Sequence, residues 1–400
     1  MKKLAVITTH PVQYHVPWFC RLAENNIQVK VFYTWEQSMH GVVFDPGFGK
    51  SFKWDIPLLE GYDYEFVHNT SRRPGLDHFG GIINPGLVQQ IEEWGAEAVL
   101  VIGWNFHSHL QCMRYFYGRI PVYFRGDSVL LDEQPGIRRL ARRIFLTWVY
   151  RHVNFAFYVG RNNKAYFLRH GLKPSQLFFS PQAIDLSRFS QPGTYYNKQA
   201  ASHRLKLGVP AHHLTILFAG KLTAIKNPFF IATLADACRG LPVSFLVVGD
   251  GKLKAALQQK CNGKDNVVFL GFQNQRMMPV IYRMGDIYLM PSLSETWGVG
   301  INEAMACRRP VIASEKVGCA VDLVKEGVTG ITFRKGDTKK CVDFIRALCE
   351  DRQRLAEMGE AAEELIQSFS FTGVIDSIAF ALGSVKTTEQ RANRFAEMNH

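Results

Sequence analysis

Short apolar runs alternate with amphipathic segments along almost the whole chain. Each run is apolar at consecutive positions and is bounded by turn residues, which is typical of strands buried on both faces of a parallel sheet. The runs are LAVITT, QVKVFYT, AEAVLVIGW, PVYFRGD, FAFYVG and LFFSPQ in the first half, and LTILFAG, SFLVVGDG, NVVFLGF, DIYLMPS, PVIAS and GITF in the second. These are too many strands for one doubly wound sheet. The pattern therefore predicts an α/β fold with two such sheets.

A polar stretch separates the two halves of the chain. Residues 186–212 carry Pro, Gly and many polar side chains, which is typical of a linker. We therefore predict one Rossmann-like domain over 1–190 and a second over 191–370, followed by an amphipathic helix at 371–385 and a polar tail at 386–400. Ligands of doubly wound sheets bind beyond the carboxyl ends of the strands, so the predicted site is the cleft where the two domains face each other.

The composition indicates which classes of partner the protein binds and which cellular compartment it occupies. The 400 residues carry a formal net charge of +12, which favours nucleotides, nucleic acid or anionic lipid surfaces. None of the eight cysteines forms a Cys-x-x-Cys pair, so we expect buried free thiols in a reducing cytosol. The apolar part of MKKLAVITTHPVQYH is too short for a signal peptide, and no run reaches the ~18 apolar residues of a membrane span. The sequence predicts a soluble or peripheral protein.

Two glycine-rich segments imitate phosphate-binding motifs without completing them. DPGFGKSFKW ends in Gly49-Lys50-Ser51, but the glycine that a P-loop needs five places earlier is Phe44. We interpret this segment as a turned loop at the rim of the cleft. Gly249-Asp250-Gly251 lacks the third glycine of a dinucleotide fingerprint. No Asp-x-Asp pair occurs, so no carboxylate-bound metal is predicted.

Two segments of the second half suit a nucleotide. In LFAGKLTAIKN, Gly220 ends a strand and is followed by Lys221 and Lys226, two cations that suit a diphosphate leaving group. The alternative is that both lysines are merely solvated. After the strand NVVFL, the segment GFQNQRMM, which contains Phe272, offers backbone groups to the edge of a base.

The stretch SETWGVGINEAMACRRPVIAS places two acids beyond a buried strand. Glu303 falls early in a helix predicted to start near Val299, where a carboxylate can accept two ribose hydroxyls. Helix N-termini attract anions, so the N–H groups near Gly298 and Val299 can hold a phosphate. Glu295 would face the other end of the ligand, and we include Trp297 in the same site. The alternative is helix capping by exposed acids.

Together these segments resemble the retaining glycosyltransferases of the GT-B fold, specifically the family-4 group. The resemblance covers most of the chain and is densest from Thr215 to Phe333. Its Glu-x7-Glu motif corresponds to Glu295 and Glu303, and its glycine and basic residues correspond to Gly220, Lys221 and Lys226. The usual first basic residue is Arg, and Gln182-Ala183-Ile184-Asp185 replaces the usual Asn-Gly-Val-Asp. HPVQYHVPWF and DPGFGKSFKWDIPLLEGYDYEF resemble a bacterial subgroup that builds surface polysaccharides such as O-antigen, capsule or exopolysaccharide.

The resemblance implies a nucleotide-sugar donor, commonly UDP-linked, bound by the second domain. Glu303 would hold the ribose, Lys221 and Lys226 the diphosphate, and Glu295 the sugar hydroxyls. It also implies transfer with retention, no metal or other cofactor, a glycan or lipid-linked glycan acceptor, and a last helix that packs back on the first domain. A nucleotide-sugar epimerase of the same fold is the first alternative. A non-catalytic basic protein that binds membrane or nucleic acid is the second, although no nucleic-acid motif is present.

The acceptor side is less sharply marked. His10, His15 and His109 follow strands and are candidates for acid–base or phosphate contacts, with His107 a further polar residue at a helix start. Many members of the family that the chain resembles carry a histidine where this chain has Arg125. Either Asp127 takes the acceptor's proton, or Arg125 anchors a phosphate, or the two form a structural pair.

Residues 137–153, IRRLARRIFLTWVYRHV, form a basic amphipathic helix. Its apolar positions recur at helical spacing, and its arginines lie across from them. They are Ile137, Leu140, Ala141, Ile144, Phe145 and Trp148 on one side and Arg138, Arg139, Arg142 and Arg143 on the other. One interpretation is contact with an anionic membrane, which would place a cytoplasmic enzyme at the inner face of the plasma membrane. The other is a domain helix with a core face and a solvated basic face.

Overall fold

A computed structural model describes residues 2–36, 42–45, 47–190 and 194–383. The chain divides into two compact units. Unit 1 comprises Met1–Gly41, Pro57–Gln182 and Phe371–His400, and unit 2 comprises Val42–Ile56 and Ala183–Ser370. The polar tail predicted at 386–400 lies outside the described residues.

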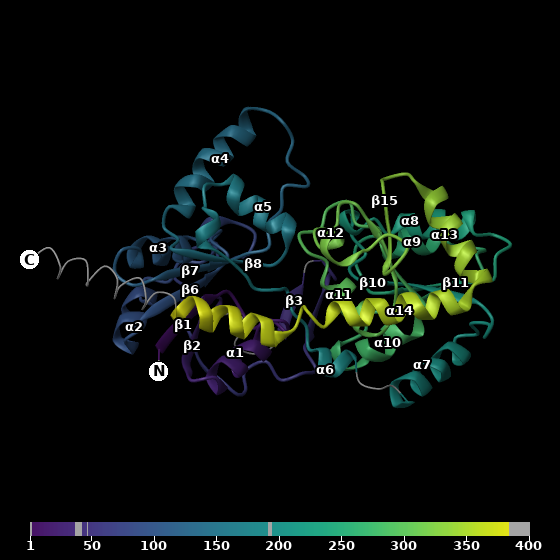
Figure 1. The fold of residues 1–400 in the computed structure, drawn as a ribbon, viewed down its shortest axis with the longest axis horizontal. Coiled ribbons are helices and arrows are strands. Elements are labelled where there is room, and N and C mark those ends of the chain that lie inside the picture. Colours follow the sequence, from purple (N-terminus) through teal and green to yellow (C-terminus); the bar gives the residue numbers. More distant parts are fainter. Residues whose placement is uncertain (1, 37–41, 46, 191–193, 384–400) are drawn as a thin grey trace, which may run out of the picture. The chain divides into compact units, whose positions relative to one another are not determined.

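A seven-stranded parallel sheet forms the centre of unit 1 (Figure 1). Its order is β5-β2-β1-β6-β7-β8-β9. The bounds are β1 (Lys2–Thr8), β2 (Ile27–Tyr33), β5 (Asp63–Phe66), β6 (Ala98–Ile102), β7 (Val122–Arg125), β8 (Phe155–Tyr158) and β9 (Leu177–Phe179). All six strands predicted for the first half are present. The edge strand β5 was missed because its sequence, DYEF, is charged and partly exposed.

Helices cover both faces of this sheet. Alternate strand residues such as Val99 and Val101 face a core that also takes in α2, α3, α4 and α5. The helices of unit 1 are α1 (Val16–Glu24), η2 (Phe79–Gly81), α2 (Leu87–Trp94), α3 (His107–Phe116), α4 (Ile137–Tyr150), α5 (Arg161–Arg169) and η3 (Pro174–Gln176).

The last helix, residues 371–383, packs within unit 1. The Lys2 ammonium donates to the carbonyl of Leu382 at 2.6 Å, and the Tyr123 hydroxyl donates to that of Ala381 at 3.0 Å. The stretch Arg352–Gly383 has the length and apolar composition of a membrane span. A turn at 367–370 nevertheless interrupts it, and Val374, Ile378 and Ala381 are buried against the rest of the protein. We therefore interpret it as two core helices.

Unit 2 repeats the architecture around a six-stranded parallel sheet of order β12-β11-β10-β13-β14-β15. The bounds are β10 (Leu214–Ala219), β11 (Val243–Val248), β12 (Val267–Gly271), β13 (Ile287–Met290), β14 (Val311–Ser314) and β15 (Gly330–Phe333). All six strands predicted for the second half are present.

The helices of unit 2 again lie on the two faces of the sheet. One core of the sheet takes in α8, α9 and α13, while α7 and α11 both pack against α10. The helix α14 contacts both α11 and α13. The helices are α6 (Leu186–Phe189), α7 (Thr194–Lys206), η4 (Ala224–Lys226), α8 (Phe229–Ala237), α9 (Lys254–Lys260), η5 (Gln275–Met277), α10 (Met278–Met284), α11 (Val299–Ala306), α12 (Ala320–Leu323), α13 (Thr338–Glu350) and α14 (Arg352–Ile366).

The division of the chain differs from the predicted one at two places. Unit 2 begins at Ala183 rather than at residue 191. It also takes in Val42–Ile56, which contains an antiparallel hairpin formed by β3 (Val42–Asp45) and β4 (Lys50–Lys53). The prediction treated the first half as one contiguous domain. It was wrong for this segment because the hairpin's contacts are with residues more than a hundred positions further along the chain.

Candidate functional site

The predicted donor residues of unit 2 lie in loops that follow neighbouring parallel strands. Because β10 pairs with both β11 and β13, the loops after these strands meet at the same edge of the sheet. The strand order also reverses between β10 and β13, which is the switch point where doubly wound sheets bind ligands. This edge carries Gly220, Lys221 and Lys226 after β10, Phe272 after β12, and Glu295, Gly298, Val299 and Glu303 after β13.

Lys226 and Glu295 form an ion pair at this edge. Their side chains are largely shielded, with exposed fractions of 25% and 17%. Lys226 ends η4, and the next residue, Asn227, adopts a left-handed conformation from which its amide donates to the Pro291 carbonyl at 3.2 Å. This bond ties the lysine loop to the end of β13. The ammonium and the carboxylate, predicted to contact leaving group and sugar, therefore lie side by side.

Glu303 is buried rather than exposed. Only 8% of the residue is accessible, and its carboxylate accepts a hydrogen bond from the Tyr282 hydroxyl at 2.7 Å. Burial raises the pKa of Glu303 above its usual range, against the opposing effect of the Tyr282 bond. An acid that caps a helix would be solvated at its surface, so the alternative of capping does not fit this geometry.

Two glycines bring the start of α11 close to the sheet. Gly298 has φ +103°, and a Cβ on it would lie 2.8 Å from Val317 Cγ1. A Cβ on Gly300 would lie 2.3 Å from the Tyr288 hydroxyl. Any side chain at either position would push the helix away. The helix begins at Val299, as predicted, and its first turn presents N–H groups that have no helical partner.

Trp297 packs the loop instead of facing a ligand. It is 3% exposed, its indole N–H donates to the Asn302 side chain at 2.9 Å, and its ring lies 5.8 Å from that of Phe369. Its proposed donor contact is therefore corrected to a structural role.

His109 is a structural residue of unit 1, which corrects its assignment to the acceptor side. It is fully buried, and both ring nitrogens are bonded. Nδ1–H donates to the Gly103 carbonyl at 2.7 Å, so Nε2 accepts from the Thr34 hydroxyl at 2.8 Å. Burial lowers the pKa of His109 to about 4. The ring is neutral at pH 7, and its two hydrogen bonds join α3 to the segments that carry Gly103 and Thr34.

The Arg125 side chain also makes structural hydrogen bonds. Its guanidinium donates to the carbonyl and hydroxyl of Ser180, at 3.0 and 2.7 Å, and to the Pro181 carbonyl at 2.9 Å. It is 3% exposed, and burial lowers its pKa to about 10. The proposed phosphate contact of Arg125 is therefore corrected to a link between the ends of β7 and β9. Asp127, two residues beyond, is exposed at the carboxyl edge.

His10 and His15 follow β1 at the same edge of the unit 1 sheet. The Thr9 hydroxyl and His10 Nδ1 lie 2.9 Å apart. Burial, together with the charges of Arg125 and His10, lowers the pKa of His15 to about 3. His15 is therefore neutral at physiological pH and cannot serve there as an acid.

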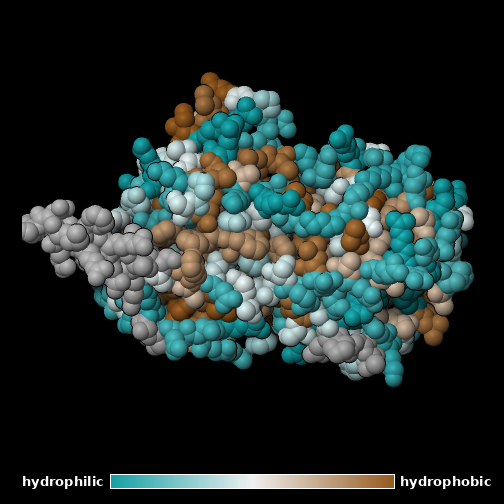
Figure 2. Space-filling view, viewed as in Figure 1, coloured by the Kyte–Doolittle hydropathy of each residue, from teal (hydrophilic) through white to brown (hydrophobic). Residues whose placement is uncertain are grey.

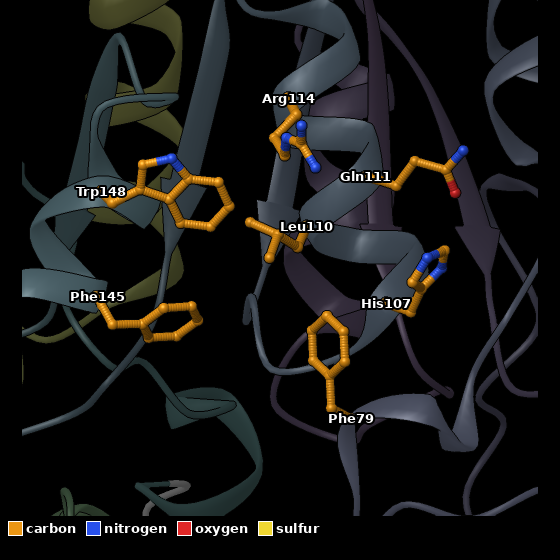
Figure 3. A pocket seen from close by; sticks show the side chains of 7 residues that line it. All are labelled: Phe79, His107, Leu110, Gln111, Arg114, Phe145 and Trp148. Carbon is orange, nitrogen blue, oxygen red and sulfur yellow. The ribbon is translucent and has the colours of Figure 1, made fainter. Parts of the chain in front are cut away.

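A cavity of about 610 Å³ lies between α3 and α4 in unit 1. Figure 3 shows Phe145 and Trp148 of α4 on one side, and Leu110 and Arg114 of α3 on the other. His107 at the start of α3 and Phe79 of η2 line the end nearer the carboxyl edge. The sequence placed His107 at a helix start but gave no signal for this cavity.

Comparison with known proteins bears on both units. Residues 200–365 match the family model described as glycosyl transferases group 1. HepE from Anabaena, solved in complex with UDP, superposes with a TM-score of 0.72 at 20% identity, over 96% of this chain and all of that one. This fold is GT-B. The GT-B chain is also similar to WaaG, a glycosyltransferase involved in lipopolysaccharide biosynthesis, with a TM-score of 0.66 at 15% identity over 94% and 98% of the two chains.

Sequence relatives cover less of the GT-B chain. A sulfoquinovosyl transferase from Arabidopsis thaliana is 30% identical over 186 residues, which are 46% of this chain and 36% of that protein. The chain spans about half the length, or less, of the curated relatives it matches. The matched family model lies within unit 2.

Sequence reasoning missed two residues at the site. Tyr282, which bonds Glu303, lies in α10 in a run that is buried throughout and reads as core. Asp45 pairs with Lys221 from the β3–β4 hairpin at 2.7 Å. The Gly and Pro content of DPGFG predicted a turn, but it did not indicate that Asp45 pairs with Lys221.

Proposed function

We propose that this protein is a retaining glycosyltransferase. It moves a sugar from a UDP-linked donor to a glycan or lipid-linked glycan during the synthesis of bacterial surface polysaccharide. The observation that carries the proposal is the gathering of Lys221, Lys226, Glu295 and Glu303 at the carboxyl edge of one parallel sheet, within a segment matched by the group 1 family model.

Each of these side chains suits one part of the donor. The bond between the anomeric carbon and the diphosphate oxygen breaks, and the electron pair leaves with the diphosphate. Lys226 and Lys221 stabilise that negative charge where it develops. The acceptor oxygen bonds to the anomeric carbon on the face from which the diphosphate departs, and Asp127 takes up the acceptor's proton. The lysines supply positive charge and the sequence has no Asp-x-Asp pair, so we propose transfer without a metal.

A panel of nucleotides tests the donor site. Thermal unfolding would be followed with UDP, GDP, ADP and their sugars, in the presence of EDTA. We expect stabilisation by UDP and by one UDP-sugar, since a ligand at a hundredfold excess over its Kd adds ~2.7 kcal/mol. The anomeric configuration of the product, followed by NMR, then tests retention. No shift with any nucleotide would reject the proposal, and a shift that requires a divalent cation would reject its metal independence.

The likeness to WaaG and the exposed surface of α4 support a membrane-linked acceptor. Ile137, Leu140 and Ile144 are 82%, 56% and 66% exposed, and Phe145 and Trp148 are partly exposed. Figure 2 shows hydrophobic residues gathered over α4 at the top of that view. The predicted core face is thus at the surface, and the helix is buried instead through Leu146, Val149 and Tyr150. We propose that α4 holds this cytoplasmic enzyme on the anionic inner face of the plasma membrane.

Reversing the charge of α4 should release the protein from anionic vesicles. Arg138 and Arg139 are both exposed, and a basic residue near such a surface contributes ~1 kcal/mol. The Arg138→Glu/Arg139→Glu variant should therefore bind phosphatidylglycerol-containing vesicles about thirtyfold more weakly or worse in co-sedimentation. The matched control is Lys198→Glu/Lys206→Glu on α7, which makes the same change in net charge on unit 2. Equal losses in both variants, or no binding by the wild type at low salt, would contradict membrane contact by α4.

A further inference from the structure

The tip of the β3–β4 hairpin lies on the donor edge of unit 2. The described residues of this tip are Asp45 and Gly47–Gly49, which belong to the DPGFG segment. The tip contacts the loops that follow three adjacent strands: Lys221 after β10, Gly251 after β11 and Phe272 after β12. The resemblance to family 4 assigns no role to this hairpin.

Asp45 uses its two carboxylate oxygens for different purposes. Oδ1 accepts the backbone N–H groups of Gly47 and Phe48, at 2.8 and 3.1 Å, and so holds the turn. Oδ2 lies 2.7 Å from the ammonium of Lys221, which also lies 5.2 Å from the centre of the Phe48 ring. The hairpin therefore supplies an anion to a lysine proposed to bind the donor diphosphate.

The close fit of the tip depends on two glycines. A Cβ on Gly47 would lie 2.6 Å from Lys221 Cδ. A Cβ on Gly251, which has φ +151°, would lie 2.9 Å from the Gly47 carbonyl oxygen and 2.7 Å from that of Leu222. A side chain at Gly251 would be strained by its own backbone and would push the hairpin away from the edge.

The hairpin also contacts the loop predicted to hold the nucleotide base. The rings of Phe48 and Phe272 meet edge to face, 5.1 Å apart. The Asn274 amide donates to the Lys53 carbonyl at 2.8 Å, and the Arg276 backbone N–H donates to the Asp55 carboxylate at 3.1 Å. One short segment thus contacts both the base loop and the diphosphate lysine.

We propose that the hairpin tip is a donor-recognition element. Asp45 holds Lys221 while the donor site is empty, and the donor diphosphate displaces the carboxylate from the ammonium. Phe48 and Phe272 form the aromatic wall that the nucleotide base packs against. Two anions beside one ammonium repel each other, so part of the diphosphate's binding energy is consumed in breaking the Asp45–Lys221 pair. This inference rests on the proposed role of Lys221 in the donor site.

Asp45→Asn separates the two functions of Asp45. The asparagine oxygen still accepts from Gly47 and Phe48, so the turn is kept, while the charge on Lys221 is no longer countered. We expect UDP to bind this variant about two- to fivefold more tightly, the size of effect measured for ion pairs of this kind. The affinity for uridine, which has no phosphate, should not change. Both can be measured by ligand-observed NMR titration.

Two further variants complete the test. Asp343→Asn, in an exposed ion pair on α13, makes the same change in net charge and should leave both affinities unaltered. Phe48→Leu should weaken UDP and uridine alike by about two- to tenfold, as expected for the loss of an aromatic contact. Unchanged or weaker binding of UDP by Asp45→Asn, while the wild type binds UDP, would overturn this inference alone. Failure of the wild type to bind any nucleotide would overturn the proposed function as well.

Discussion

Replacing Glu303 with glutamine should weaken the binding of UDP about tenfold to a hundredfold, because hydrogen bonds to a charged acceptor contribute ~1.5–3 kcal/mol. Glutamine is preferred to alanine here. Its carbonyl oxygen can still accept from the Tyr282 hydroxyl, whereas alanine would leave that buried hydroxyl without an acceptor. Calorimetric titration of the variant and the wild type measures the difference. An unchanged UDP affinity would remove Glu303 from the ribose site.

Tyr282→Phe provides the matched control for Glu303. It keeps the carboxylate but removes a hydrogen bond that lowers the pKa of Glu303. If Glu303 binds the ribose as proposed, donor binding needs the ionised carboxylate, so affinity should be lost as the pH falls through that pKa. In Tyr282→Phe the pKa rises further, and the loss should begin at a higher pH than in the wild type. A purely structural role of Tyr282 would lower stability without moving the midpoint of this pH profile.

Replacing Lys226 with alanine should lower kcat by about 10²–10³, the usual cost of removing one group that stabilises developing negative charge. The affinity for the donor should change much less, because the leaving oxygen carries more negative charge in the transition state than in the bound donor. Comparing steady-state turnover with a directly measured donor Kd separates the two effects. Weaker donor binding with an unchanged kcat would show that Lys226 binds ground state and transition state alike.

The Lys226 experiment needs a correction for its partner. Removing the ammonium leaves the Glu295 carboxylate partly buried without its counter-charge. Glu295→Gln and the double variant Lys226→Ala/Glu295→Gln therefore accompany the single variant. If the double variant recovered most of the activity, the loss in Lys226→Ala would come from the stranded carboxylate. Lys339→Ala, in an exposed pair on α13, controls for net charge.

The sequence predicted the sheets better than the site. Twelve apolar runs became twelve strands because burial on both faces demands continuous apolar residues, a local property. The start of the helix that carries Glu303 could also be predicted from neighbouring residues, since α11 begins within the predicted turn. The contacts of polar residues that follow strands were harder to predict. Arg125 ends β7 and Asp127 follows it, yet the first side chain turns inward to Ser180 and the second stays exposed. Only the packing of distant segments decides between these outcomes.

The hairpin shows the same limitation. Asp45 and Lys221 are far apart in sequence, and neither segment alone indicates the other. DPGFG predicted a turn correctly in kind, because its glycines permit one. Its place on unit 2 depends on contacts with Lys221, Gly251 and Phe272, which no periodicity encodes.

The division into units also bears on how the protein is made. Unit 1 is complete only when residues 371–383, which follow unit 2 in the sequence, have been synthesised. Until then the side of its sheet that includes Tyr123 lacks the last helix, and apolar surface stays open during translation of all of unit 2. Unit 2 in turn uses a hairpin synthesised long before the rest of it. Unit 2 therefore has all of its segments before unit 1 does, although unit 1 begins first in the sequence. Domains that fold as units during synthesis would here be completed in the reverse of the order in which they begin.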